Sequence, residues 1–390
     1  MDPITALLDG VLEESRSLRH GATADYIPEL ADADPEPLAL AVVGPRGRVR
    51  GVGDDRVEFT IQSISKPFVL ALALQERGRD AVLATVGVEP SGEPFNAISL
   101  EEGTGRPANP MVNAGAIATT SLVPGAGIEE RTTRIVETLS AFAGRSLWVD
   151  EAVYASESAT GDRNRALAHL LRSYGVIEGA VDTAVETYFR QCALLVTVRD
   201  LAVMGATLAF GGVNPATGDR VIEEHVARDV LSIMAGCGMY DFSGEWLLRV
   251  GLPAKSGVSG GLLAVAPSQF GVAAFSPRLD EHGNSVRAGA AVASIADRFG
   301  MHLLEPHDSI AVPAITVRSR GAERIVQLSG ELGFAGTERV AAVLKELAGA
   351  VAPGTRVTVD ARELARTHPA AMVALRDEFA VMPAGFRLRE

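Results

Sequence analysis

Cysteine is scarce in this chain of 390 residues, which carries only Cys192 and Cys237. The two are not spaced like metal ligands, and two thiols in a chain of this size are typical of a reducing compartment. The seven histidines show no metal-ligand spacing, and no glycine-rich phosphate loop follows a predicted strand. We therefore expect a cytoplasmic protein with two buried, inert thiols and no metal or cofactor.

Long hydrophobic runs are also missing. The most apolar windows, FVLALAL and GGLLAVA, are far shorter than the ~20 residues that a membrane-spanning helix needs. The first residues, MDPITALLDGVLEESRS, carry acidic side chains where a secretory signal would carry basic ones. The sequence predicts neither a membrane span nor export.

Basic residues are outnumbered and scattered. The chain has 36 Lys and Arg against 49 Asp and Glu, a formal charge of −13, and no basic stripe. Nucleic acid is therefore not an expected partner. With 47% hydrophobic and 22% charged residues the composition is that of an ordinary globular protein, and the length favours two domains.

The apolar periodicity predicts an α/β (α+β) fold. Residues 4–19 have helical spacing, residues 38–63 predict two strands joined by a Pro/Gly turn, and residues 66–250 are mostly helical. Strand character returns in residues 249–277. Strands at both ends with helices between them predict one sheet with a helical insert that covers a cleft.

The pattern changes near residues 301–314, where we expect a domain boundary. The remainder alternates strand (324–332), helix (336–351), strand (356–361) and helix (369–379), which is typical of a small α/β domain. We therefore predict a first domain over 1–308 and a second over 312–390.

Ser63 and Lys66 form an S-x-x-K pair where a polar stretch becomes an apolar helical one. With a helix starting near Ser65, Pro67 occupies its first turn, and Lys66 can fold back toward Ser63. A lysine activates a serine only when burial or neighbouring charge keeps the amine uncharged. Alone the spacing is weak, because most such pairs are a helix cap beside a solvated charge.

A second element strengthens the prediction of an active site. Lys255, Ser256 and Gly257 resemble the K-[ST]-G strand that lines the far wall of serine acyl-transferase sites. The flanking glycines allow a ligand close to the backbone, where the amides of Ser63 and Val258 could form an oxyanion hole. The alternative is a glycine-rich turn between two strands.

With these elements in place, the chain resembles the serine-dependent glutaminases, which share the fold of β-lactamases and penicillin-binding proteins. That fold implies an antiparallel sheet and a helical cluster in the first domain. The resemblance covers most of residues 20–275. It lies in seven blocks: ADYIPEL (24–30), QSISKPF (62–68), EPSGEPFN (89–96), NPMVNAGAI (109–117), SESATGDRNRALA (156–168), GCGMYDFSGEW (236–246) and LPAKSGVSGG (252–261).

The resemblance implies hydrolysis of L-glutamine to L-glutamate and ammonia through a glutamyl-enzyme ester, without a cofactor. Ser63 would be the nucleophile and Lys66 its base, and Tyr240 could relay protons. Glu157 would bind the substrate ammonium, while amide and phenol donors would hold its carboxylate. The implied substrate contacts are Tyr26, Gln62, Ser63, Asn113, Glu157, Asn164, Tyr188, Tyr240 and Val258.

Residues 312–390 resemble the STAS domain more weakly. Where regulatory relatives carry a phosphorylatable serine, this sequence has Thr367 and no serine, so a phosphorylation switch is not expected. We expect instead that the domain pairs subunits in a homo-oligomer, a dimer or tetramer, or docks a protein partner. Two other functions stay open: another serine acyl hydrolase of the same fold, and a non-catalytic STAS-type regulatory protein.

Overall fold

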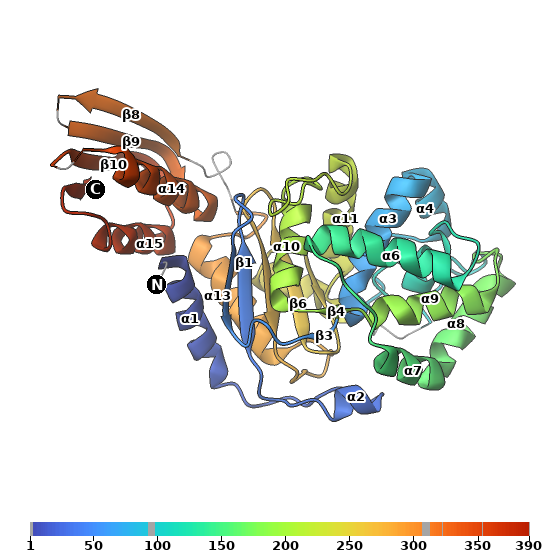
Figure 1. Ribbon diagram of the computed structural model, residues 1–390. Coiled ribbons are helices and arrows are strands. Elements are labelled where there is room, and N and C mark those ends of the chain that lie inside the picture. Colours follow the sequence, from blue (N-terminus) through green and yellow to red (C-terminus); the bar gives the residue numbers. More distant parts are fainter. Residues whose placement is uncertain (1–2, 93–97, 306–312, 322, 353, 390) are drawn as a thin grey trace.

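The computed structural model describes residues 3–92, 98–305, 313–321, 323–352 and 354–389. It shows a mixed α/β protein in which a central sheet lies between a helical cluster and a smaller C-terminal region (Figure 1). The predicted domain boundary at residues 308–312 lies outside the described residues, as do positions 93–96 of one resemblance block.

The central sheet joins strands from both ends of the first 275 residues, as the sequence predicts. All neighbouring pairs are antiparallel, and the strand order is β2-β1-β7-β6-β5. Its strands are β1 (Ala39–Val43), β2 (Val49–Gly53), β5 (Ala254–Ser256), β6 (Gly261–Ala266) and β7 (Phe270–Phe275). The predicted hairpin is present as β1 and β2, but β3 (Phe59–Thr60) leaves it to pair with β4 (Leu195–Val196).

Both faces of this sheet are covered, which explains why β1, β6 and β7 are apolar at every position. Along β1, Ala41 and Val43 belong to one core and Leu40 and Val42 to another, because successive side chains point to opposite faces. One face packs against α1 (Pro3–Arg16) and α13 (Val286–Phe299), the other against α10 (Val198–Ala209).

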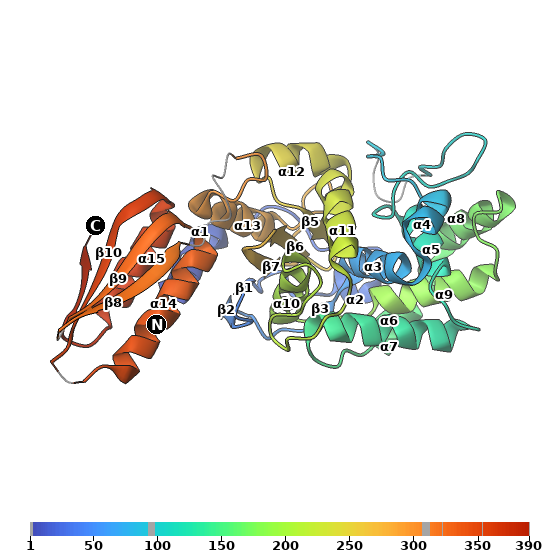
Figure 2. The ribbon, with the colours of Figure 1, turned by 90° about the horizontal axis from the view of Figure 1, so that it is seen from above.

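The helical cluster occupies the end of the molecule opposite the C-terminal region (Figure 2). It comprises α3 (Lys66–Arg77), α4 (Arg79–Thr85), α5 (Asn113–Ser121), α6 (Ile128–Ala143), α7 (Glu151–Thr160), α8 (Asp162–Ser173) and α9 (Val181–Cys192), while α11 (Glu224–Cys237) and α12 (Ser243–Arg249) lead back to the sheet. The short helix α2 (Pro28–Ala31) packs near α7.

The C-terminal region contains the predicted alternation of strands and helices. Strands β9 (Glu323–Leu332), β10 (Arg356–Thr367) and β11 (Phe386–Arg389) are parallel, and β8 (Ala314–Arg320) is antiparallel to β9. Helices α14 (Phe334–Ala350) and α15 (Pro369–Ala380) pack between this sheet and the rest of the molecule (Figure 1).

A buried junction joins the two regions. Arg50 in β2 and Glu338 in α14 form an ion pair with 2.6 Å between Nη1 and Oε1, and both side chains are buried. Beside it, the rings of Phe270, Phe299 and Phe334 pack edge to face. The C-terminal region is therefore anchored by apolar and ionic contacts together.

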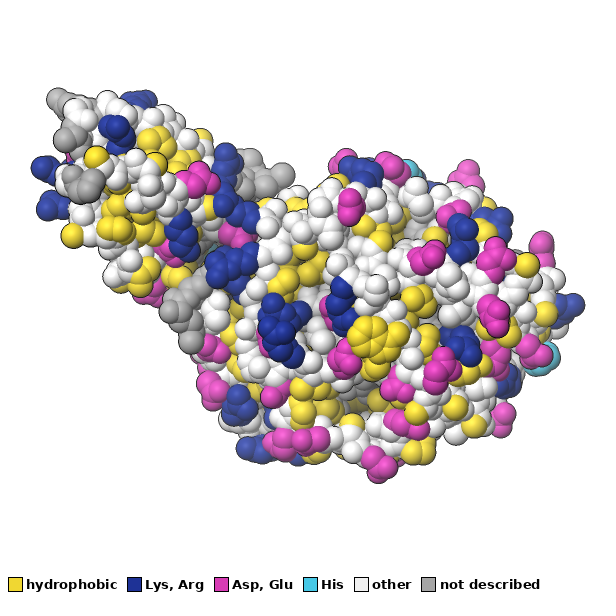
Figure 3. All heavy atoms as spheres, viewed as in Figure 1, with side chains coloured by type: hydrophobic (Ala, Val, Ile, Leu, Met, Phe, Trp, Pro, Cys, Tyr) yellow, Lys and Arg dark blue, Asp and Glu magenta, His cyan; other side chains and the backbone are white. Residues whose placement is uncertain are grey.

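Within the described ranges, every helix is too short or too polar to cross a bilayer. On the face seen in Figure 3, acidic and basic side chains are interspersed over the surface.

Candidate active site

The Ser63 turn opens helix α3. Ser63 lies in the 3-10 turn η1 (Gln62–Ser65), which runs directly into Lys66, and Pro67 occupies the first turn as predicted. Gln62, immediately before Ser63, has φ of +49°, a left-handed conformation that residues with a side chain rarely adopt. The hydroxyl of Ser63 is thus presented from a strained turn.

Tyr240 meets Ser63 from the other side. It begins a second 3-10 turn, η2 (Tyr240–Phe242), with φ of +59°. Its hydroxyl shares a hydrogen bond with the Ser63 side chain and donates to Ser256 O at 3.2 Å. Burial raises the pKa of Tyr240 to about 12. Because its proton is directed at Ser256, the phenol oxygen can accept a hydrogen bond from the Ser63 hydroxyl.

Lys66 is buried, and its amine is held by oxygen atoms. Nζ donates to Asn113 Oδ1 at 2.8 Å and to Met111 O at 3.1 Å. Burial lowers the pKa of Lys66 to about 7, so that a large fraction of the amine is uncharged at neutral pH. These bonds join Lys66 to Asn113 and Met111 and do not include the predicted fold back to Ser63; its role as base remains a prediction.

Strand β5 lies against the Ser63 turn, as the K-S-G prediction requires. Lys255 Nζ lies 3.7 Å from the centre of the Tyr240 ring and donates to Ser256 O at 2.8 Å. Burial, with the nearby charge of Lys66, holds the pKa of Lys255 well below its usual value. A Cβ at Gly257 would lie 3.1 Å from Ile61 O, so the missing side chain permits this close approach.

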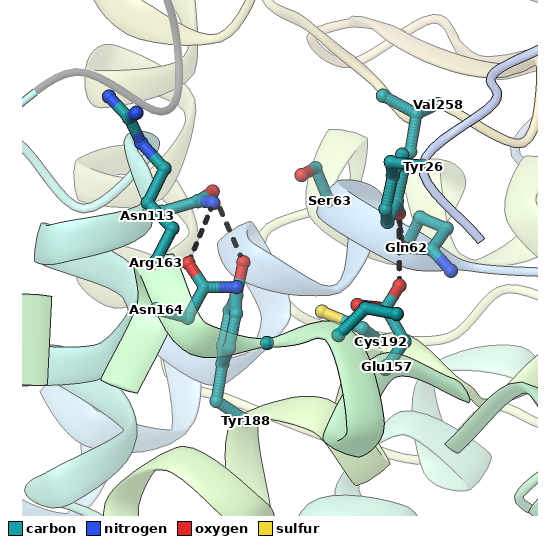
Figure 4. A pocket seen from close by; sticks show the side chains of 12 residues that line it. Tyr26, Gln62, Ser63, Asn113, Glu157, Arg163, Asn164, Tyr188, Cys192 and Val258 are labelled. Carbon is teal, nitrogen blue, oxygen red and sulfur yellow. Dashed lines mark hydrogen bonds between the residues drawn. The ribbon is translucent and has the colours of Figure 1, made fainter. Parts of the chain in front are cut away.

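A cavity of about 240 Å³ opens beside Ser63. Eight of the predicted substrate contacts line it, with Tyr240 behind Ser63. In Figure 4, Ser63 lies between two groups of these side chains. The eight are Tyr26, Gln62, Ser63, Asn113, Glu157, Asn164, Tyr188 and Val258.

The first group surrounds the carboxylate of Glu157, which is 6% exposed. The hydroxyl of Tyr26 lies 2.9 Å from Glu157 Oε1 and 3.1 Å from Gln62 Oε1. Burial raises the pKa of Glu157, while hydrogen bonds from Tyr26 and Gln62 act in the opposite direction. A buried carboxylate with phenol and amide neighbours suits an ammonium group, because the positive charge of the ammonium would compensate the negative charge of Glu157.

The second group is built around Asn113 at the start of α5. Its Nδ2 donates to Asn164 Oδ1 at 3.1 Å, and its Oδ1 accepts from Tyr188 at 3.2 Å as well as from Lys66. Three helices, α5, α8 and α9, therefore supply neutral hydrogen-bonding groups to one wall, and the same amide links this wall to the buried amine.

Four lining residues are absent from the predicted set: Thr160, Gly161, Arg163 and Cys192. The first three lie between Glu157 and Asn164 in one resemblance block, so their place in the sequence could have predicted that they line the same cavity. Cys192 follows Tyr188 by four residues on α9 and hence shares its face. Burial raises the pKa of Cys192 to about 12. Both cysteines are free and buried, as predicted.

The described part of the chain brings no three His, Cys, Asp or Glu side chains together in a way that could hold a metal ion.

Comparison with known proteins gives a consistent family. The model of a family described as Glutaminase matches residues 21–304. A glutaminase of Corynebacterium glutamicum is 44% identical over 389 residues, which are 99% of this chain and 93% of its own. One from Trichormus variabilis is 50% identical over 303 residues, 78% of this chain and 91% of its own.

A solved structure described as Mglu in its glutamate form has a TM-score of 0.77 and 40% identity, and the match covers 100% of this chain and 99% of that one. The family match and the identity along nearly the whole length show that this chain belongs to the glutaminase family.

Proposed function

We propose that this glutaminase hydrolyses the side-chain amide of L-glutamine to L-glutamate and ammonia with Ser63 as its nucleophile. The observation that carries the proposal is the position of Ser63, between a buried carboxylate group and a neutral amide group and in hydrogen-bond contact with Tyr240. The curated relatives are named glutaminases, which supports the reaction itself.

In the first half of the reaction, Ser63 Oγ attacks the carbonyl carbon of the substrate's side-chain amide. Its proton passes, directly or by relay through the Tyr240 hydroxyl, to the uncharged amine of Lys66, and the resulting ammonium gives a proton to the amide nitrogen that leaves as ammonia. The backbone amides of Ser63 and Val258 stabilise the oxyanion. Water then hydrolyses the glutamyl ester and restores the Ser63 hydroxyl.

The two groups of pocket residues hold the amino-acid end of the substrate. Glu157 binds the ammonium, and Tyr26 and Gln62 orient its carboxylate. Asn113, Asn164 and Tyr188 hold the substrate carboxylate. A site with a carboxylate for a free ammonium rejects acylated amines, which argues against a β-lactam or peptide hydrolase of the same fold.

The test compares ammonia release from glutamine and asparagine by the intact chain and by Ser63→Ala. We expect the variant to lose hydrolysis of glutamine, because the covalent step has no other nucleophile. Its matched control is Ser15→Ala, which removes a buried hydroxyl in α1 that donates to Val11 O at 3.0 Å. Turnover by Ser63→Ala equal to that of Ser15→Ala would refute Ser63.

For the remaining assignments we propose a β-lactamase-like fold for residues 1–308 and a STAS-like domain for 312–390. The parallel order of β9, β10 and β11 with α14 and α15 supports the second. We also propose a cytoplasmic homo-oligomer, a dimer or tetramer, in which the C-terminal region pairs subunits or docks a protein. Light scattering of the intact chain measures the subunit number.

A further inference from the structure

The two turns that carry Ser63 and Tyr240 are built alike. Among the described residues, positive φ in a residue other than glycine occurs at Gln62, Tyr240 and Ser268. The first two begin the 3-10 turns η1 and η2, and each turn leads into a helix. Such strained conformations persist only where the surrounding structure holds them.

A serine three residues later holds each strained residue. Ser65 Oγ donates to Gln62 O at 2.8 Å, and Ser243 Oγ donates to Tyr240 O at 2.8 Å. Both serines are buried. We call these two hydroxyls the serine clamps. Each clamp closes a loop across its turn and fixes the peptide plane that follows the strained residue.

The direction of each clamp is itself fixed, because each hydroxyl also accepts a hydrogen bond. Ser65 Oγ accepts from Gln191 Nε2 at 3.2 Å, and Gln191 Oε1 accepts from Thr120 at 2.9 Å. Ser243 Oγ accepts from the amide of Met239 at 3.0 Å. With its acceptor side occupied, each hydroxyl has one proton, and that proton is directed at the strained carbonyl.

We propose that Ser65 and Ser243 are positioning residues for glutamine hydrolysis: their hydroxyls hold the carbonyls of Gln62 and Tyr240 and thereby set the approach of the Ser63 and Tyr240 hydroxyls. This inference rests on the proposed role of Ser63. Neither clamp lines the cavity, so both act through the residues that they hold.

The two clamps differ in one measurable way. Gln62 also contacts Tyr26 at 3.1 Å, beside the carboxylate proposed to bind the substrate ammonium. Loss of the Ser65 clamp therefore disturbs both the nucleophile and the binding group. Loss of the Ser243 clamp disturbs Tyr240 and the amide of Met239, neither of which lines the cavity.

The experiment measures kcat and KM for Ser65→Ala, Ser243→Ala and the control Ser15→Ala. We expect kcat to fall roughly 10- to 100-fold in both clamp variants, since misplacement by about 1 Å costs up to that factor. KM rises in Ser65→Ala and stays unchanged in Ser243→Ala. Ser15→Ala loses the same kind of buried serine-to-carbonyl bond and keeps its kcat.

Gln191→Leu tests the support of the first clamp. It lowers kcat in the intact chain but has little further effect in Ser65→Ala, because Gln191 acts on the Gln62 carbonyl only by directing the Ser65 hydroxyl. Calorimetric binding of L-glutamate to every variant shows that the pocket is folded.

If both clamp variants bind glutamate and keep kcat within about twofold of Ser15→Ala, the positioning proposal is overturned. If a clamp variant loses glutamate binding and melts below the assay temperature while Ser15→Ala does not, the clamp supports folding and the proposal also fails. Activity retained by Ser63→Ala instead removes the proposed nucleophile, a separate result.

Discussion

Buried ionisable side chains have opposite roles in the active-site cleft and at the junction with the C-terminal region. In the cleft, Lys66 and Lys255 donate to neutral oxygens, and burial lowers the pKa of both amines. At the junction, Arg50 meets the carboxylate of Glu338 at 2.6 Å. The cleft thus keeps amines that can lose their charge, while the junction keeps charges that neutralise each other.

The contrast shows that different buried residues of one chain serve catalysis in the cleft and stability at the junction. Burying an amine among neutral groups lowers the stability of the folded protein, but it leaves part of the amine uncharged and able to accept a proton at neutral pH. A guanidinium paired with a carboxylate stays charged and in place. Removing either partner leaves the other charge buried without a counter-charge. Changes in the cleft should therefore alter turnover at little cost in stability, and changes at the junction should do the reverse.

The largest effect is expected for Lys66→Met. We expect kcat to fall about 10²- to 10⁴-fold, the usual contribution of a general base. Thermal stability should stay equal or rise, because an apolar chain of similar length replaces a buried amine. Steady-state kinetics and scanning calorimetry measure both. A large fall in melting temperature would contradict the contrast drawn between the two regions.

The next effect concerns the junction. Arg50→Met leaves Glu338 buried without its guanidinium, which should cost about 3–5 kcal/mol of unfolding free energy. Turnover measured well below the melting temperature should remain that of the intact chain. Urea unfolding gives the free energy, and the double variant Arg50→Met with Glu338→Gln is the matched control, in which part of the loss returns. A proportional loss of kcat would show that the two regions are coupled.

A smaller effect is expected from pH. If uncharged Lys66 is the base, kcat/KM should rise about tenfold per pH unit up to about 7 and then level. Stability has the same sign: between about 7 and 10.5 the unfolded chain holds a proton that the folded chain has lost, so stability increases with pH across that window. Lys66→Met should lack this contribution to the slope. A flat rate profile below pH 7 would exclude Lys66 as the base.

The smallest effect is expected at an exposed ion pair. Arg298 in α13 lies 2.5 Å from Glu14 in α1, and the two side chains are 37% and 59% exposed. Like the junction pair, it connects distant parts of the chain, but water already solvates both charges. Arg298→Ala should change the unfolding free energy by less than ~1 kcal/mol, again measured in urea. A cost equal to that of Arg50→Met would mean that burial does not explain the difference.

Much of the cleft was predictable because its residues lie in contiguous blocks. Glu157 and Asn164 share one block, and Gly161 between α7 and α8 turns both side chains toward the same cavity. The strands and helices of the C-terminal region were likewise predictable, because their apolar periods are regular.

What the sequence did not indicate depends on long-range geometry. A three-residue spacing places Lys66 near Ser63, but the start of α5 decides that its amine reaches Asn113. Residues 50 and 338 are 288 positions apart, so no local pattern pairs them. The positive φ of Gln62 and Tyr240 follows from contacts rather than from the identity of either residue.

The ion pair between Arg50 and Glu338 also limits the order in which the protein can fold during synthesis. During synthesis β2 leaves the ribosome long before α14, so Arg50 cannot pair with Glu338 until that residue is made 288 residues later. Only then can water be expelled from between the two groups. The junction therefore forms late in folding, after every residue that lines the cleft has been synthesised.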